Sequence, residues 1–148
     1  MVKILPFLWS LSMFAAPACA ESGISGAWMT GEKKATVEIT RTDDGWIGRI
    51  VALKEPLTPE GEEKTDYKNP DPSRRKDPII GLRILWGFKA KGANTWSGGF
   101  VYDAETGKTY HATLTLKNDQ LLLRGSLDRW GMAGRSVTWT RPTKEKSP

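Results

Sequence analysis

The sequence predicts an all-β protein, an antiparallel up-and-down meander of about eight strands that closes into a barrel. Apolar residues recur with a period of two almost throughout the chain after residue 20, which is typical of half-buried strands. Short turn sequences separate these segments, and a meander of this length leaves two exposed edges unless it closes. A sandwich of two sheets is the alternative architecture.

The first twenty residues have the pattern of a cleavable signal peptide. Lys3 precedes an uncharged, mostly apolar run over residues 4–16, and Ala18-Cys19-Ala20 matches the small-x-small site of signal peptidase. We therefore expect cleavage after Ala20 and a periplasmic or secreted protein. The run is short for a permanent membrane span, which needs about 20 residues. A retained anchor and lipidation at Cys19 are the alternatives.

Residues 21–148 are expected to form a single β-barrel domain. Cleavage removes Cys19, the only cysteine, so an ordinary apolar core must hold the fold instead of disulfides. The full chain has a formal net charge of +5, but its basic residues are spread along the sequence. A nucleic-acid-binding protein concentrates such charge in a recognisable module. We expect no nucleic-acid partner and no transmembrane segment after processing.

The strands can be placed in order from the alternation. The first begins at Gly26, and the next two, Ala35 to Ile39 and Trp46 to Leu53, flank an Asp-Gly turn signal at Asp44-Gly45. The alternating residues that mark the later strands are Ile84, Trp86 and Phe88; Trp96, Gly98, Phe100 and Tyr102 on one face; Tyr110, Ala112, Leu114 and Leu116; Leu121, Leu123 and Leu127; and Arg135, Val137, Trp139 and Arg141.

One long segment, residues 54–78, interrupts the alternation with five prolines, many charges and few apolar residues. Loops of this length in compact domains are usually functional or mobile. Asp and Asn just before Pro favour fixed turns, so a purely structural role is one interpretation. The other is that Asp66, Asn69, Asp71 and Arg74 present polar groups at the mouth of the barrel as part of a ligand site.

The aromatic residues have two interpretations. After residue 20 the chain has tryptophans at positions 28, 46, 86, 96, 130 and 139, and large aromatic side chains usually fill a core. They can also line a cavity for an apolar ligand. In that case Trp86, Tyr102 and Tyr110 are the residues that we expect to line it.

Nothing in the sequence indicates a metal, cofactor or catalytic site. His111 is the only histidine and no cysteine remains after processing, which excludes a transition-metal site. The long loop lacks the carboxylate spacing of a calcium-binding EF-hand, and no Gly-x-Ser-x-Gly nucleophile turn occurs. We expect no cofactor and no enzyme activity. A hydrolase or isomerase that uses carboxylates such as Asp66 and Asp71 is a further hypothesis, but the sequence offers no base–nucleophile pair to support it.

Two resemblances add to this interpretation. Gly26-x-Trp28 resembles the start of lipocalin-type barrels, in which a basic residue of the last strand packs across the tryptophan. Arg141, or else Arg135, could close the barrel in this way by a cation–π contact.

From Gly26 to Arg141 the chain also resembles a bacterial family catalogued as domain of unknown function 2147. The motifs that carry this resemblance are Gly26-x-Trp28, Gly48-Arg49-Ile50-Val51, Asp66-x-x-Asn69-Pro70-Asp71-Pro72, Pro78-x-x-Gly81-Leu82, Trp96-x-Gly98-Gly99-x-x-Tyr102-Asp103, Gly107-Lys108-x-Tyr110, Leu123-x-Gly125 and Gly134-Arg135-x-x-x-Trp139-x-Arg141. The resemblance implies a secreted protein with a lipocalin-like barrel and no established activity.

The leading hypothesis is a periplasmic, non-enzymatic lipocalin-like protein that binds a small, partly apolar ligand in the barrel interior or mouth. The alternative is a non-catalytic envelope assembly or interaction protein that displays residues 54–78 to another envelope protein.

Overall fold

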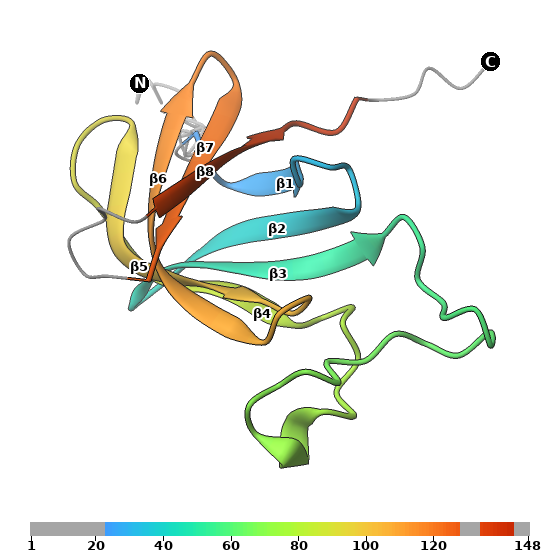
Figure 1. Cartoon of the computed structure of the whole chain (residues 1–148). Coiled ribbons are helices and arrows are strands. Elements are labelled where there is room, and N and C mark those ends of the chain that lie inside the picture. The colour runs from blue at the N-terminus through green and yellow to red at the C-terminus, as the bar shows by residue number, and fades with distance from the viewer. Residues whose placement is uncertain (1–22, 128–133, 144–148) are drawn as a thin grey trace, which may run out of the picture.

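A computed structural model of the chain describes residues 23–127 and 134–143 (Figure 1). The strands are β1 (Gly26–Met29), β2 (Ala35–Thr42), β3 (Gly45–Leu53), β4 (Arg83–Ala90), β5 (Thr95–Asp103), β6 (Lys108–Lys117), β7 (Gln120–Ser126) and β8 (Gly134–Thr140), with a short 3-10 helix η1 (Pro72–Arg74). Each strand pairs with its sequence neighbours, and β1 pairs with β8 to close the barrel. The predicted all-β closed meander is confirmed. No helix among the described residues is long and apolar enough to cross a bilayer.

The inward face of the strands builds one apolar core. Trp28, Phe88 and Leu114 are completely buried, and Trp46 and Trp96 meet edge to face with their ring centroids 6.4 Å apart. The other buried apolar residues are Ile24, Val37, Ile39, Ile50, Ile84, Leu85, Ala112, Leu121, Leu123 and Trp139. Tyr102 is also buried, but on the outer face of β5, where Asp66 of the long loop contacts it. Of the six tryptophans considered for the core, Trp130 lies outside the described residues.

Two strands change face part of the way along, which the alternation does not predict. In β5 the register shifts by one residue between Trp96 and Gly99, where Gly98 has a φ of 74°. The extra residue is a β-bulge, so the side chains on either side of it point to opposite faces of the sheet. Trp96 therefore faces the core, whereas Phe100 and Tyr102 face outward. The prediction that these residues share one face is wrong.

The same correction applies to β4. Its register with β3 shifts between the pairs formed by Phe88 and by Leu85, and Gly87 has a φ of 77°. Phe88 is buried in the core, while Trp86 pairs with Phe100 on the outer face. Trp86 and Tyr102, which we expected to line the barrel interior, are therefore on its outside. Tyr110 pairs with Val101 on the inner face.

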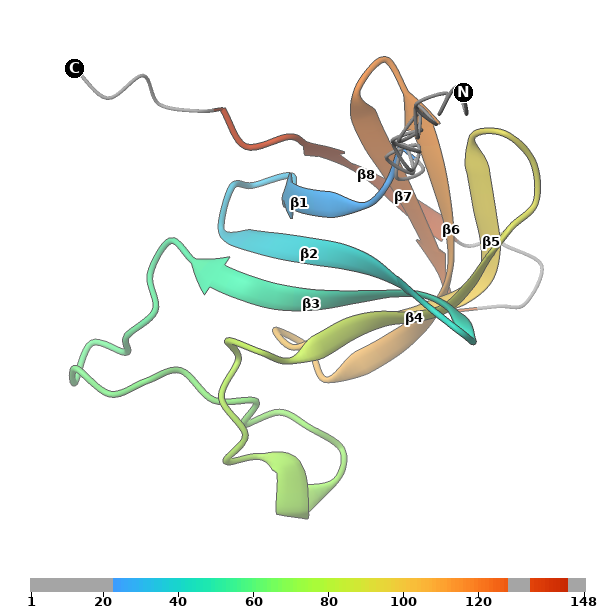
Figure 2. The same cartoon turned by 180° about the vertical axis from the view of Figure 1, so that it is seen from behind.

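The segment between β3 and β4 folds beside the barrel, on the side where β3 and β4 lie (Figures 1 and 2). It carries two isolated antiparallel bridges, Leu57 with Glu63 and Thr65 with Pro78, besides η1. Its last residues return to β3, because the Gly81 amide donates to the Ile50 carbonyl and the Ile50 amide donates to Leu82. The long loop therefore has a defined structure of its own, which positions the site described next.

Candidate functional site

A buried carboxylate attaches the long loop to the barrel wall. Asp66 is 0% exposed, and one of its oxygens, Oδ1, accepts a hydrogen bond of 2.7 Å from the Tyr102 hydroxyl of β5. Its other oxygen, Oδ2, accepts one of 2.7 Å from the Asn69 side-chain amide. The pKa of the Tyr102 hydroxyl is raised, mainly by burial and also by the hydrogen bond to Asp66. The tyrosine therefore stays protonated and acts as a donor to the carboxylate.

The polar residues that follow form successive turns. The Asn69 side-chain oxygen accepts from the Asp71 amide at 2.9 Å, and Asp71 caps η1 by accepting from the Ser73 amide at 3.0 Å and hydroxyl at 2.8 Å. These hydrogen bonds lower the pKa of Asp71. Such turns are what Asn and Asp before proline favour. Asn69 and Asp71 thus shape the loop, as the structural interpretation of this segment requires.

The loop also packs against the β5–β6 turn. Lys68 Nζ donates to the Glu105 carbonyl at 2.7 Å. Gly107 has a φ of 74°, and a Cβ at this position would overlap the Lys68 carbonyl oxygen. Only glycine allows the turn both this backbone conformation and this close approach. The loop is therefore held at two places on the outer wall.

A cavity of about 270 Å³ lies between the long loop and the outer face of β4–β6. Its lining residues are Asn69, Pro70, Arg74, Leu82, Arg83, Trp86, Tyr102 and Thr109. Trp86 stacks on Phe100, with centroids 5.7 Å apart and an interplanar angle of 24°, and Arg83 lies 5.5 Å from the Trp86 centroid. The cavity therefore has an aromatic wall with a guanidinium group at its edge.

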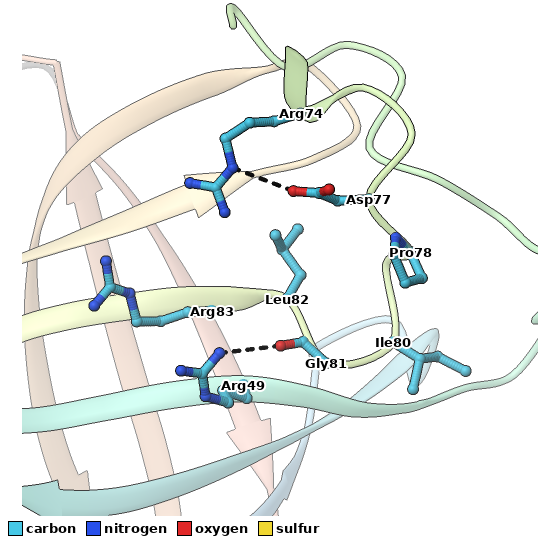
Figure 3. Close-up of a pocket in the computed structure, with 8 residues that line it drawn as sticks. All are labelled: Arg49, Arg74, Asp77, Pro78, Ile80, Gly81, Leu82 and Arg83. Carbon is cyan, nitrogen blue, oxygen red and sulfur yellow. Dashed lines mark hydrogen bonds and ion pairs between the residues drawn. The ribbon is translucent and has the colours of Figure 1, made fainter. Parts of the chain in front are cut away.

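A second cavity, of about 430 Å³, adjoins the first and shares Arg74, Leu82 and Arg83 with it. Figure 3 shows its lining residues, among them Arg49 from β3, Arg83 from β4 and Asp77 from the loop. We call the two cavities together the loop groove. Both lie outside the barrel, and none of the completely buried core residues lines either of them.

The structure brings together part of the predicted ligand site. Asn69, Arg74, Trp86 and Tyr102 all line the smaller cavity, and Asp66 lies beneath it. Asp71 and Tyr110 line neither cavity. The sequence analysis missed Arg49, Leu82 and Arg83. These residues lie close together because Arg49 of β3 pairs with Arg83 of β4. No local feature of the sequence indicates which residues of the two strands pair.

The other end of the barrel has a different construction. The Arg141 guanidinium carbon lies 3.9 Å from the Trp28 ring centroid. Its Nη1 donates to the Ser25 and Ala27 carbonyls at 2.9 and 3.2 Å, and its Nη2 donates to Gly23 at 2.7 Å. Arg141 thus ties the segment before β1 to the last strand across a buried tryptophan, and we treat this group as structural.

Guanidinium groups and apolar side chains line the loop groove. Across residues 23–127 and 134–143, no three His, Cys, Asp or Glu side chains gather in a way that could hold a metal ion. His111 is exposed and packs on Phe100, with ring centroids 5.1 Å apart. It therefore belongs to an aromatic row on the outer wall.

A closed eight-stranded meander with an arginine directly after the last strand packed over a tryptophan of the first strand is a lipocalin-like barrel. In agreement, the fold is similar to a solved structure described as "Protein HP1028 from the human pathogen Helicobacter pylori belongs to the lipocalin family". The TM-score is 0.71 at 24% identity, over 82% of this chain and 84% of that one, which shows a shared fold.

The sequence itself matches, over residues 26–141, the family described as "Uncharacterized protein conserved in bacteria (DUF2147)". The chain belongs to this family, as its motifs predict. No curated protein matches it.

Proposed function

We propose that this protein is an exported, non-enzymatic binding protein that holds a small, partly apolar ligand in the loop groove. The observation that carries the proposal is the smaller cavity, in which Trp86 and Leu82 offer apolar surface beside the polar groups of Asn69 and Arg74. Small-molecule sites typically combine mostly apolar walls with a few placed polar groups.

The rigid attachment of the loop supports this proposal over binding inside the barrel. The hydrogen bond from Tyr102 to Asp66 joins the loop to the wall by a contact within the protein, which favours a preorganised groove. A site that is already formed avoids the entropy cost of ordering a loop on binding. The barrel interior, by contrast, is occupied by close-packed aromatic and aliphatic side chains.

Native mass spectrometry of protein purified from its own host without detergent tests ligand binding. We expect a bound small molecule that is lost in Trp86→Ala and kept in Tyr67→Ala. Tyr67 is a suitable control because it is an aromatic residue of the long loop, is 66% exposed and lines neither cavity. Circular dichroism checks that both variants fold. A mass equal to the bare chain, together with no response to a panel of amphiphiles, would contradict the proposal.

Export rests on the pattern of the first twenty residues. Mass spectrometry of the protein from the periplasmic fraction should give a chain that starts at Glu21. A chain that retains residues 1–20 in the membrane fraction would contradict export and favour an anchor.

A second candidate function is display of the long loop to another envelope protein. It is favoured by two exposed apolar side chains on the loop, Leu57 at 53% and Tyr67 at 66% exposure. Replacing both with Ser should abolish capture of a specific partner while Trp86→Ala leaves capture intact. The opposite pattern supports the loop groove as the functional site.

A further inference from the structure

Three arginines meet around the larger cavity of the loop groove, each from a different part of the chain. Arg49 comes from β3, Arg83 from β4 and Arg74 from η1, and Figure 3 shows all three beside the cavity. Asp77 is the only carboxylate among its lining residues, and it pairs with Arg74 at 3.2 Å. The wall of this cavity therefore carries an excess of positive charge.

Arg49 lies opposite Glu38 of β2 on one side, and on the other side Arg49 and Arg83 bring two like charges together. The two residues are direct cross-strand partners, and like charges in that position destabilise a sheet. The contacts of Arg49 include one hydrogen bond of 3.2 Å, from Nη1 to the Gly81 carbonyl. A guanidinium carries five N–H donors, so most of those on Arg49 remain available for a ligand.

Apolar surface continues directly from this charged region. Leu82 and Arg83 line both cavities, and the smaller cavity leads on to Trp86. Ile80, 37% exposed, adds an apolar side chain at the charged end. A molecule that spans the loop groove thus meets Arg49 at one end, Arg74 and Arg83 where the two cavities join, and the aromatic wall of Trp86 at the other end.

From this arrangement we infer that the ligand is an anionic amphiphile. Its carboxylate or phosphate group binds among Arg49, Arg74 and Arg83, and its apolar body lies along Leu82 against Trp86. Planar guanidinium groups suit carboxylate and phosphate oxygens because they donate two parallel hydrogen bonds. This inference rests on the proposed function and adds the chemical class of the ligand.

Isothermal titration calorimetry of the processed protein tests the inference with four probes: dodecanoate, dodecyl phosphate, a neutral dodecyl glycoside and inorganic phosphate, all below micelle-forming concentration. We expect the two anionic amphiphiles to bind more tightly than the neutral one by about tenfold or more, and added salt to weaken them. Arg83→Gln should weaken the anionic probes by roughly tenfold, the effect of losing one charge-assisted contact. Lys89→Gln, which removes an equal charge from the far end of β4, should leave binding unchanged.

A readout without ligand separates this role from a structural one. If Arg83 serves the fold, Arg83→Gln lowers the melting temperature of the free protein. If it serves an anion, the melting temperature changes little, because loss of the contact with Trp86 is offset by removal of the repulsion from Arg49.

Each result of the titrations has one meaning. Tighter binding of both anionic amphiphiles supports the inference, while preference for one of them identifies the head group. Equal binding of the neutral and anionic probes overturns the inference and leaves the proposed function standing. Binding of inorganic phosphate as tight as that of dodecyl phosphate also overturns it, because the apolar body then contributes nothing. Failure of all four probes counts against the proposed function itself.

Discussion

Replacing Tyr102 with Phe tests how the long loop is held. The substitution removes the hydroxyl that donates to Asp66 at 2.7 Å and leaves a completely buried carboxylate with one fewer donor. A hydrogen bond to a charged group contributes about 1.5–3 kcal/mol. We take about 2 kcal/mol, because Tyr102 itself is only 8% exposed. That value corresponds to a roughly 30-fold larger equilibrium constant for undocking the loop.

Limited proteolysis with trypsin measures this constant, because the loop carries cleavage sites at Lys64, Lys68 and Arg75. When opening and closing are fast, the cleavage rate follows the population of the open form. We expect loop cleavage to be roughly 10–30-fold faster in Tyr102→Phe, and the free energy of unfolding in urea to fall by up to about 2 kcal/mol. Tyr67→Phe is the control, because the Tyr67 side chain is largely exposed. Equal cleavage rates in the two variants would refute this account of the loop.

The same contact predicts a dependence on alkaline pH. The pKa of Tyr102 is raised in the folded protein, while a tyrosine in an unfolded chain titrates near pH 10. The contribution of Tyr102 to stability is therefore complete below about pH 10 and declines as the pH rises above it. We expect the difference in unfolding free energy between the native protein and Tyr102→Phe to shrink above about pH 10. A difference that grows with pH would contradict the assigned donor.

Two further predictions concern stability. Arg141→Ala should lower the unfolding free energy by about 2–3 kcal/mol in urea denaturation, because it removes the cation–π contact with Trp28 and charge-assisted hydrogen bonds; a loss below about 0.5 kcal/mol would contradict the closure role. Gly107→Ala should destabilise more than Gly61→Ala by about 1–3 kcal/mol in the same assay. Both glycines have positive φ, but only a Cβ at Gly107 meets the Lys68 backbone. Equal losses would contradict the close packing of the loop.

The candidate site was only partly predictable because two glycines hide a change of face. Gly87 and Gly98 sit at bulges, and each bulge reverses which side chains point inward. A simple even–odd pattern assigns Trp86 and Tyr102 to the barrel interior and misses the outer groove. Glycine inside a strand is itself a signal of a bulge, so this signal was present in the sequence.

The chain pattern by itself determined the number and order of the strands, the turn positions and the existence of the long loop. It could do so because alternation and turn residues act over a few neighbouring positions. Only the tertiary structure decided that Asp66 contacts Tyr102, 36 residues away, and that Arg49 of β3 pairs with Arg83 of the neighbouring strand β4. Such pairs depend on the register and on the bulges, which follow from how the whole barrel packs. The loop groove is therefore a property of the folded chain.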